Sequence, residues 1–301
     1  MNNSKRDNTI EITFTMDDIV VYEEPWDYDE LPGIEVPYLH HYRSGSSIEN
    51  IFRNDGIYLR FTRGDSFPDK MEGKAIEVYY DLAIEDLLDQ GKITAEQYQR
   101  IIGICPPHFM FTHEERNGID FFTRAEFTPY IFCFSTIKDD PHMYNLVKDT
   151  NTSGKYSFSM DTTVVSQLTQ LGSKNDFQIK LRKILYGKSV VEYIQQKVLY
   201  MLKNPPLYSG AEAYLREYLH RLQFMAKLSK YKGENEVRMI VKVPKPRNSP
   251  HPDFFFEDDE KYLFLKIPKS FVFKITPQKD NDKSLDDNLL STLNKRGYPY
   301  A

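Results

Sequence analysis

Short runs in which apolar and polar residues alternate predict β-strands along most of the chain. Side chains two positions apart on a strand share a face, so each run gives one apolar and one polar face. The run 130–136 carries no charge, which predicts a central strand buried on both faces. The predicted strands lie within residues 9–22, 36–44, 57–62, 130–136, 155–161, 177–187, 236–243, 261–268 and 270–277.

Apolar residues three and four apart predict helices between these strands. The predicted helices span residues 46–56, 81–90, 94–102, 162–172, 189–203, 210–230 and 284–297. Ser46 or Ser47 is the predicted N-cap of the first helix, and Asp81 that of the second. Thr94 with Gln97 has the spacing of a capping box.

The mixed order of strands and helices predicts an α+β fold, with a mixed, mainly antiparallel sheet flanked by helices. Residues 1–35 are expected to form an N-terminal extension. Residues 36–301 are expected to form a single α+β domain, with a helical insert near 81–102 and a helical lobe near 189–230.

Composition narrows the classes of protein. The 301 residues are 40% hydrophobic and 28% charged, as in ordinary globular proteins. A net charge of −5 argues against a protein that mainly coats nucleic acid, although it allows a local basic patch. Two cysteines are too few for a disulfide framework, which predicts a reducing compartment. Without a signal-peptide core or an apolar run of membrane-span length, we expect a cytoplasmic protein with no membrane partner.

The cysteine and histidine residues offer two kinds of candidate site, a metal site and a nucleophilic thiol. Cys105, His108 and His113 are close in sequence, with Glu114 and Glu115 after them. Zinc needs three or four ligands on a rigid frame, and no second cluster apart from His142 complements these residues, so no metal is expected. A nucleophilic Cys133 with His40 or His142 is the other arrangement. Cys133 lies in an apolar strand, where a free cysteine usually acts as a small hydrophobic residue.

Polar side chains lie at one end of each of three predicted strands. Arg43, Ser135 and the pair Glu234 and Glu236 occupy these places. An arginine can clamp a phosphate, a hydroxyl can orient it, and a carboxylate can bind a ribose hydroxyl. In the competing interpretation, Arg43 and Arg238 pair with the two glutamates on a solvated sheet edge.

The order of arginine, Ser-Thr and Glu-x-Glu resembles that of the ADP-ribosyltransferase superfamily, which splits NAD at its nicotinamide–ribose bond. The resemblance implies NAD as the cofactor, Glu236 as the group that polarises the ribose hydroxyl, and Glu234 as an aid to acceptor activation. Arg43 would hold phosphate and Ser135 the nicotinamide ribose.

The first strand leaves alternatives open within the same resemblance. Tyr42 and His41 are also candidate cofactor-binding residues. In the family's histidine variant, His40 or His41 would take the place of Arg43.

A broader resemblance rests on the strings "IENIFRNDGIYLRFTRGDSFPDKMEG" and "KLSKYKGENEVRMIVKVP". They resemble a widespread bacterial family, catalogued as domain of unknown function 2971, over about residues 38–298. Some of its members are linked to abortive phage infection. This resemblance implies an uncharacterised bacterial protein. Together with the resemblance to ADP-ribosyltransferases, it predicts a toxin or phage-defence effector that acts on a protein or nucleic-acid acceptor.

The alternative function is a non-catalytic protein- or nucleic-acid-binding module of a defence or toxin–antitoxin system. A strip of basic residues on the helices 189–230 would supply its interface. The strip consists of Lys197, Arg216, Arg221, Lys227, Lys230 and Lys232.

Overall fold

The computed structural model describes ten segments of the chain and a few single positions between them. The segments are 36–66, 75–104, 127–147, 154–162, 178–203, 222–244, 254–257, 260–269, 273–279 and 283–298. The single positions are 164, 168, 215, 218, 219 and 281. The predicted strands at 9–22 and the expected N-terminal extension lie outside the described residues.

A ten-stranded sheet forms the centre of the fold, and every strand pair in it is antiparallel. Its strands are β1 (Tyr38–Ser44), β2 (Phe52–Arg53), β3 (Gly56–Arg63), β4 (Phe127–Ser135), β5 (Lys155–Asp161), β6 (Gln178–Lys183), β9 (Glu236–Pro244), β10 (Phe254–Glu257), β11 (Tyr262–Ile267) and β12 (Phe273–Pro277). A separate parallel pair joins β7 (Leu185–Tyr186) to β8 (Ala226–Lys227).

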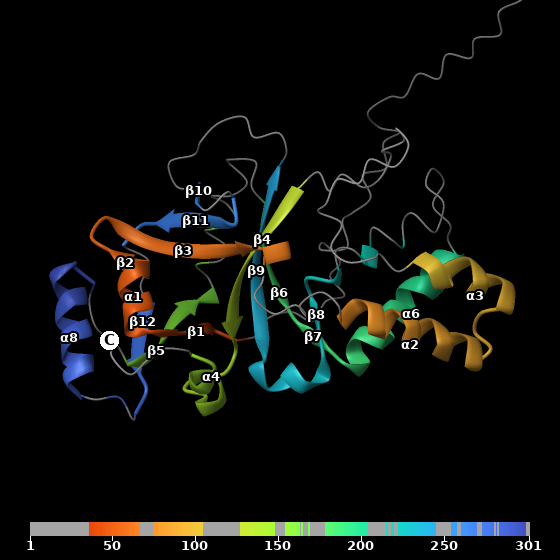
Figure 1. Ribbon diagram of the computed structural model, residues 1–301, viewed down its shortest axis with the longest axis horizontal. Helices are drawn as coiled ribbons and strands as arrows, with labels where there is room; N and C mark the ends of the chain where they lie inside the picture. Colours follow the sequence, from red (N-terminus) through yellow and green to blue (C-terminus); the bar gives the residue numbers. More distant parts are fainter. Residues whose placement is uncertain are drawn as a thin grey trace, which may run out of the picture.

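β4 holds two halves of the sheet together. One of its edges pairs with β9 along the whole strand. Its other edge pairs first with β3, at Ile131, and then with β1, at Ser135. β3, β11 and β10 therefore leave β4 in one direction and β1, β5 and β12 in another (Figure 1).

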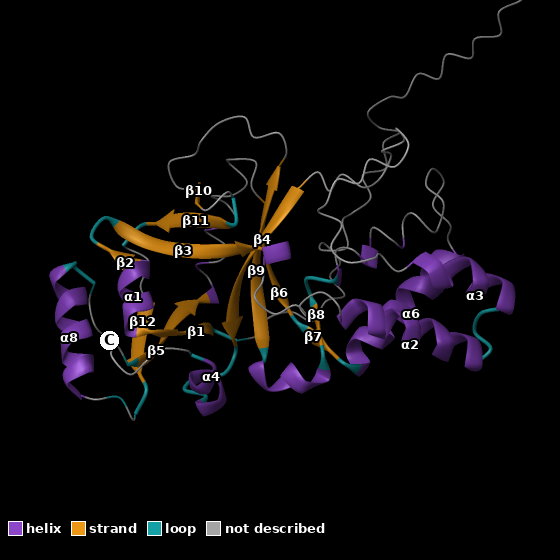
Figure 2. Ribbon diagram, viewed as in Figure 1, coloured by secondary structure: helices purple, strands orange, loops and turns teal. Residues whose placement is uncertain are grey.

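The described helices are α1 (Gly45–Ile51), α2 (Ala75–Asp89), α3 (Ala95–Ile101), α4 (Pro141–Leu146), α6 (Lys188–Lys203) and α8 (Lys283–Lys295), with the 3-10 helices η3 (Gly64–Ser66), η4 (Ile102–Ile104) and η5 (Ser229–Glu234). α1 and α8 lie at one end of the molecule and α2, α3 and α6 at the other, while α4 lies between them beneath the sheet (Figure 2). None of the described helices has the length and apolar character that a membrane span requires.

Two hydrophobic cores lie on opposite faces of the sheet. The first holds Leu39, Phe132, Phe158 and Met239 and is closed by α1 and α8. The second lies in the helical lobe of α2, α3 and α6 and meets the sheet at Ile131, where alternation turns the side chain away from the first core. The predicted α+β fold with a mainly antiparallel sheet is confirmed.

The bounds of two helices differ from the prediction. Ser44 caps α1, because its hydroxyl accepts a hydrogen bond from the Ser47 amide, and the helix ends at Ile51 rather than Gly56. α2 begins at Ala75, so Asp81 is not an N-cap; the apolar face, which includes Ile76, extends the helix by more than a turn. The capping box of Thr94 is confirmed.

In the second half of the chain, one predicted helix needs correction, and two successive predicted strands lie in different halves of the sheet. The helix predicted over 210–230 does not reach residue 230, because Ala226 pairs with Leu185 in the β7–β8 ladder and η5 follows. The strands predicted over 261–268 and 270–277 follow one another in the sequence, but they do not pair with each other in the described sheet. β11 instead pairs with β3 and β10, while β12 pairs with β5 on the other half of the sheet.

Candidate functional site

Strand register places a histidine, a serine and a glutamate side by side on three adjacent strands. His40 on β1 is opposite Ser135 on β4, and Ser135 is opposite Glu236 on β9. On the other side of β1, Ser159 of β5 is opposite His40. Directly opposed residues share a face, so all four side chains lie on the face turned away from the first hydrophobic core. We call these four residues the polar row.

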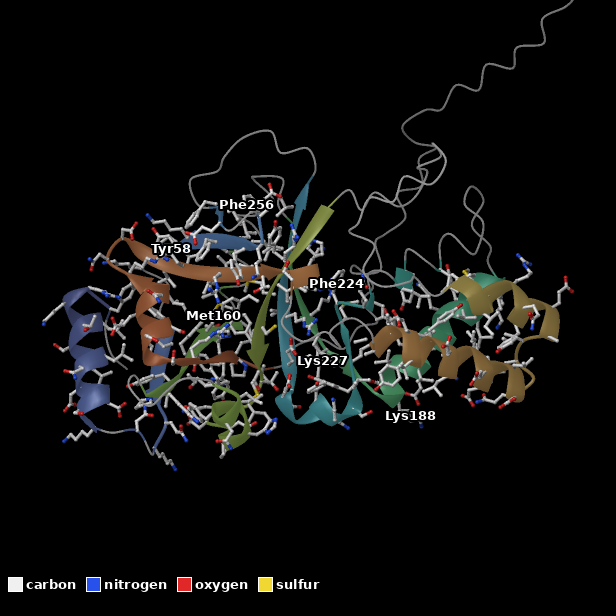
Figure 3. The ribbon with its side chains drawn as sticks, viewed as in Figure 1. Tyr58, Met160, Lys188, Phe224, Lys227 and Phe256 are labelled. Atoms are coloured by element: carbon white, nitrogen blue, oxygen red, sulfur yellow. The ribbon has the colours of Figure 1, made fainter. Side chains whose placement is uncertain are left out.

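The carboxylate of Glu236 is buried between two cations. Its Oε1 accepts a hydrogen bond of 2.6 Å from Arg238 Nε, and its Oε2 forms an ion pair of 2.6 Å with Lys227 Nζ. Lys227 also binds Glu234 at 2.7 Å, and Arg238 Nη1 donates to the Phe224 carbonyl. Glu236 is 4% exposed and Arg238 fully buried. Figure 3 labels Lys227 and Phe224 beside β9.

Glu236 is ionised at neutral pH. Burial alone would raise its pKa, but the charges of Arg238 and Lys227 outweigh burial and lower the pKa to about 2. The Cys133 thiol also forms a hydrogen bond with this carboxylate. Glu236 can therefore accept hydrogen bonds and stabilise positive charge, but it cannot act as a general acid near pH 7.

His40 is held in the row by one ring nitrogen. Its Nδ1 lies 2.8 Å from the Ser159 hydroxyl, and the residue is 5% exposed. Burial lowers the pKa of His40, with Asp139 opposing and Lys138 adding to the effect, so the imidazole is neutral at pH 7. Among the described residues, Nε2 has no hydrogen-bond partner.

The Ser135 hydroxyl forms its hydrogen bonds with backbone groups. It donates to the Glu234 carbonyl at 2.8 Å and accepts from the Ile137 amide at 3.2 Å. The side chain is completely buried. Ser135 thus ties the end of β4 to the turn that leads into β9, and holds Glu234 and Glu236 in place.

Tyr42 shares the face of His40 but closes the loop after β4. Its hydroxyl donates to the Ile137 carbonyl at 2.6 Å and accepts from the Asp140 amide at 3.1 Å. Its ring meets the Tyr144 ring edge-on, with centroids 4.8 Å apart. Burial raises the pKa of Tyr42 to about 12, so it stays a neutral hydrogen-bond donor.

Arg43 and His41 lie on the opposite face of β1. His41 Nδ1 is 2.6 Å from the Cys133 carbonyl oxygen, which can only accept, so Nδ1 carries the proton. Its Nε2 accepts from Arg43 Nε at 2.7 Å, and the imidazole packs against the Phe132 ring. The structure therefore does not bring Arg43 or His41 together with Ser135 and Glu236; His40 occupies that position.

Three sequence candidates remain: the Cys105 loop, the Cys133 thiol with His40, and His142. The Cys105 loop lies outside the described residues, and within the described part no three His, Cys, Asp or Glu side chains gather as a metal would require. His40 bonds Ser159 rather than a thiol, and burial raises the pKa of Cys133 well above its usual range. His142 is exposed on α4.

Only part of the predicted basic strip is exposed: Lys230 and Lys232 are exposed on η5, whereas Arg216 and Arg221 lie outside the described residues. Lys197 is 7% exposed and lies over the rings of Tyr200 and Tyr218. Lys227 is used by the buried carboxylates.

Of the competing interpretation, the pair of Arg238 with Glu236 is confirmed at 2.6 Å. Its other parts are wrong: Arg43 bonds His41, and β9 lies between β4 and β6 inside the sheet rather than at a solvated edge.

Sequence reasoning missed Ser159, and it placed Lys227 in the basic strip rather than beside Glu236. The polar face that carries Ser159 could have been inferred, because alternation in "KYSFSMD" puts Ser157 and Ser159 on one face and Tyr156 and Phe158 on the other. No sequence pattern places Lys227 beside Glu236, because only the β7–β8 ladder brings it to the start of β9.

Comparisons with protein-family models, with curated proteins and with solved structures found no match. The two resemblances noted from the sequence therefore stay predictions. The geometry of the polar row is what supports a functional proposal.

Proposed function

We propose that the protein is an NAD-using enzyme of the ADP-ribosyltransferase type, serving as a toxin or phage-defence effector. The observation that carries this proposal is the register His40–Ser135–Glu236 on adjacent strands. It sets an imidazole that is neutral at pH 7 and a carboxylate that is ionised at pH 7 on the same face of the sheet, with a serine between them. Arg43, the first-strand residue expected from sequence, gives way to His40.

The residues take distinct roles in this proposal. His40 Nε2 binds a ribose hydroxyl, because Nδ1 is already held by Ser159. Lys138, whose side chain is about half exposed and whose charge acts on His40, provides a cation for phosphate. Glu236 polarises the nicotinamide ribose and stabilises the positive charge that develops on it. Ser135 is a positioning residue that fixes the turn carrying Glu234.

The reaction transfers the ADP-ribosyl group to an acceptor. The bond between ribose C1′ and the nicotinamide nitrogen breaks, and nicotinamide leaves with the electron pair. The acceptor nucleophile forms the new bond to C1′ and loses its proton. Glu234, whose Oε2 lies 2.7 Å from Lys227 Nζ, aids acceptor activation.

The test uses His40→Asn, which leaves the buried ion pairs intact. We expect the wild type to consume NAD in the presence of protein or nucleic-acid acceptors, and His40→Asn to lower the rate at least tenfold. The matched control is His142→Asn, an exposed histidine, which should keep the wild-type rate. Nicotinamide release measured by chromatography is the readout, with circular dichroism to verify folding.

Two results would count against the proposal. The first is unchanged NAD after long incubation of the wild type with protein, RNA and DNA acceptors. The second is NAD consumption by folded His40→Asn at the rate of wild type, which would move the chemistry away from the polar row.

A second candidate function is a non-catalytic binding module. The observation in its favour is that Glu234 and Glu236 already have cationic partners inside the protein, as structural charges do. In that case a defence partner should bind the His40→Asn protein as tightly as the wild type, and neither should release nicotinamide.

A further inference from the structure

The face of β3, β11 and β10 turned away from the first core carries aromatic and basic side chains in register. Tyr58 is opposite Lys266, and Arg60 is opposite Phe264. On the next strand, Phe255 is opposite Phe264. This face is set apart from the first hydrophobic core, which takes the alternate residues of the same strands.

Cations on this face lie over aromatic rings. Arg60 lies 4.6 Å from the centroid of the Tyr262 ring, and Lys261 lies 5.2 Å from the same centroid. Arg53 lies 4.4 Å from the Tyr58 ring, and Lys266 lies 5.6 Å from it. We call this surface the cation–aromatic platform.

Two phenyl rings extend the platform onto β10. The rings of Phe255 and Phe264 stack with centroids 5.1 Å apart and an interplanar angle of 4°. Phe264 is buried beneath its neighbours, whereas Phe255 and Tyr262 keep part of their surface exposed. The partly exposed rings of Phe255 and Tyr262 thus rest on buried residues of the sheet and lie beside cations.

The charge on the platform is positive although the chain as a whole carries −5. Asp55 bonds Lys266 at 2.7 Å, and Glu257 shares the face beside Tyr262. Arg60 is exposed and has no carboxylate partner among the described residues. An exposed cation of this kind is available to a polyanion.

We propose that the cation–aromatic platform binds single-stranded nucleic acid. Arg60, Lys261 and Arg53 contact phosphates, while unpaired bases stack on Phe255 and Tyr262. A duplex hides its bases in the helix, so it offers these rings nothing to stack on. The inference does not rest on the proposed NAD chemistry, although Thr62 opposite Ile131 puts the platform and the polar row on the same face of the sheet.

Binding is measured on the full-length protein by fluorescence anisotropy with labelled 12-nucleotide probes. The probes are single-stranded RNA, single-stranded DNA and the matching DNA duplex, each of mixed sequence. We expect either single strand to bind at least tenfold more tightly than the duplex, with affinity falling as salt rises. The two single-stranded probes distinguish RNA from DNA as the natural ligand.

Two variants separate the phosphate contacts from stacking. Arg60→Gln should weaken binding and reduce the slope of log affinity against log salt by about 0.7, the share of one phosphate contact on a single strand. Tyr262→Leu should weaken binding about tenfold while the salt slope stays close to that of wild type. Phe255→Leu repeats the stacking test in case Tyr262→Leu unfolds.

The matched control is Lys188→Gln, which removes an exposed cation from the helical lobe and should bind as the wild type does. The proposal is overturned if neither single strand binds at 100 mM salt. It is also overturned if duplex or inorganic polyphosphate binds as tightly as single strands while folded Tyr262→Leu and Phe255→Leu lose nothing, since the surface would then read charge alone.

Discussion

Glu236 and its two cations show how a buried charge cluster is held at the residue scale. Taking charges out of water costs free energy, and the cost is offset only when each charge is closely paired. Arg238 and Lys227 meet the two carboxylate oxygens at 2.6 Å each. The cluster therefore stabilises the folded protein while all three members are present, and it destabilises the folded protein once one member is lost.

We predict that acid weakens the protein through Glu236. Its folded pKa of about 2 lies below the ordinary value of 4.5, so its contribution is complete above pH 4.5 and is lost as pH falls toward 2. Urea unfolding from pH 2.5 to 7 should show this loss. Glu236→Gln, which leaves buried cations uncompensated, should lower the free energy of unfolding by about 3–5 kcal/mol at pH 7 and flatten the acid slope.

Asp55 supplies the comparison for this prediction. Lys266 and Tyr58 bond its carboxylate and lower its pKa to about 2 as well, but Asp55 is exposed. Solvent screens such a pair, so Asp55→Asn should leave the pH profile close to that of wild type. Parallel profiles for wild type and Glu236→Gln would show that the acid loss arises elsewhere.

At the scale of the element, local signals were reliable where the chemistry is local. The capping box at Thr94 needs only residues three apart, and the structure has it. The end of the helix predicted over 210–230 depended on distant residues, because Ala226 and Lys227 join a ladder with Leu185 and Tyr186. Helical periodicity cannot report a partner forty residues away.

Removing the cap should cost a predictable amount. Thr94→Ala deletes the hydroxyl that accepts from the Gln97 amide at 3.1 Å, so the free energy of unfolding should fall by about 1 kcal/mol. Gln99→Ala, an exposed position in the same helix, should change it by less than about 0.5 kcal/mol. Chemical denaturation measures both, and equal effects would mean that the cap contributes nothing of its own.

At the scale of the whole molecule, the sheet and the helical lobe meet around Phe224. Its carbonyl accepts from Arg238, and its ring belongs to the second core. Gly64, directly after β3, faces this ring so closely that a Cβ there would lie 2.5 Å from it. The absence of a side chain at Gly64 is thus a condition for the contact.

Gly64→Ala should therefore destabilise the protein by about 1–3 kcal/mol, the usual cost of overpacking. Phe224→Leu should recover part of that loss in the double variant, because it frees the space that the new methyl group needs. Gly233→Ala is the control, since its nearest neighbour would be 3.9 Å away. Strictly additive effects in thermal or urea unfolding would contradict a contact between these two residues.

The sequence by itself determined the α+β class, most strands and the two faces of each strand. Alternation in "YLHHYRS" separated His40 and Tyr42 from His41 and Arg43, because side chains on a strand have a period of two. It could not say which of the two faces meets Ser135 and Glu236. That choice depends on register and on the split of the sheet at β4, which many distant contacts set together. Only the tertiary structure placed His40 in the row, brought Lys227 to Glu236 and turned Arg43 away.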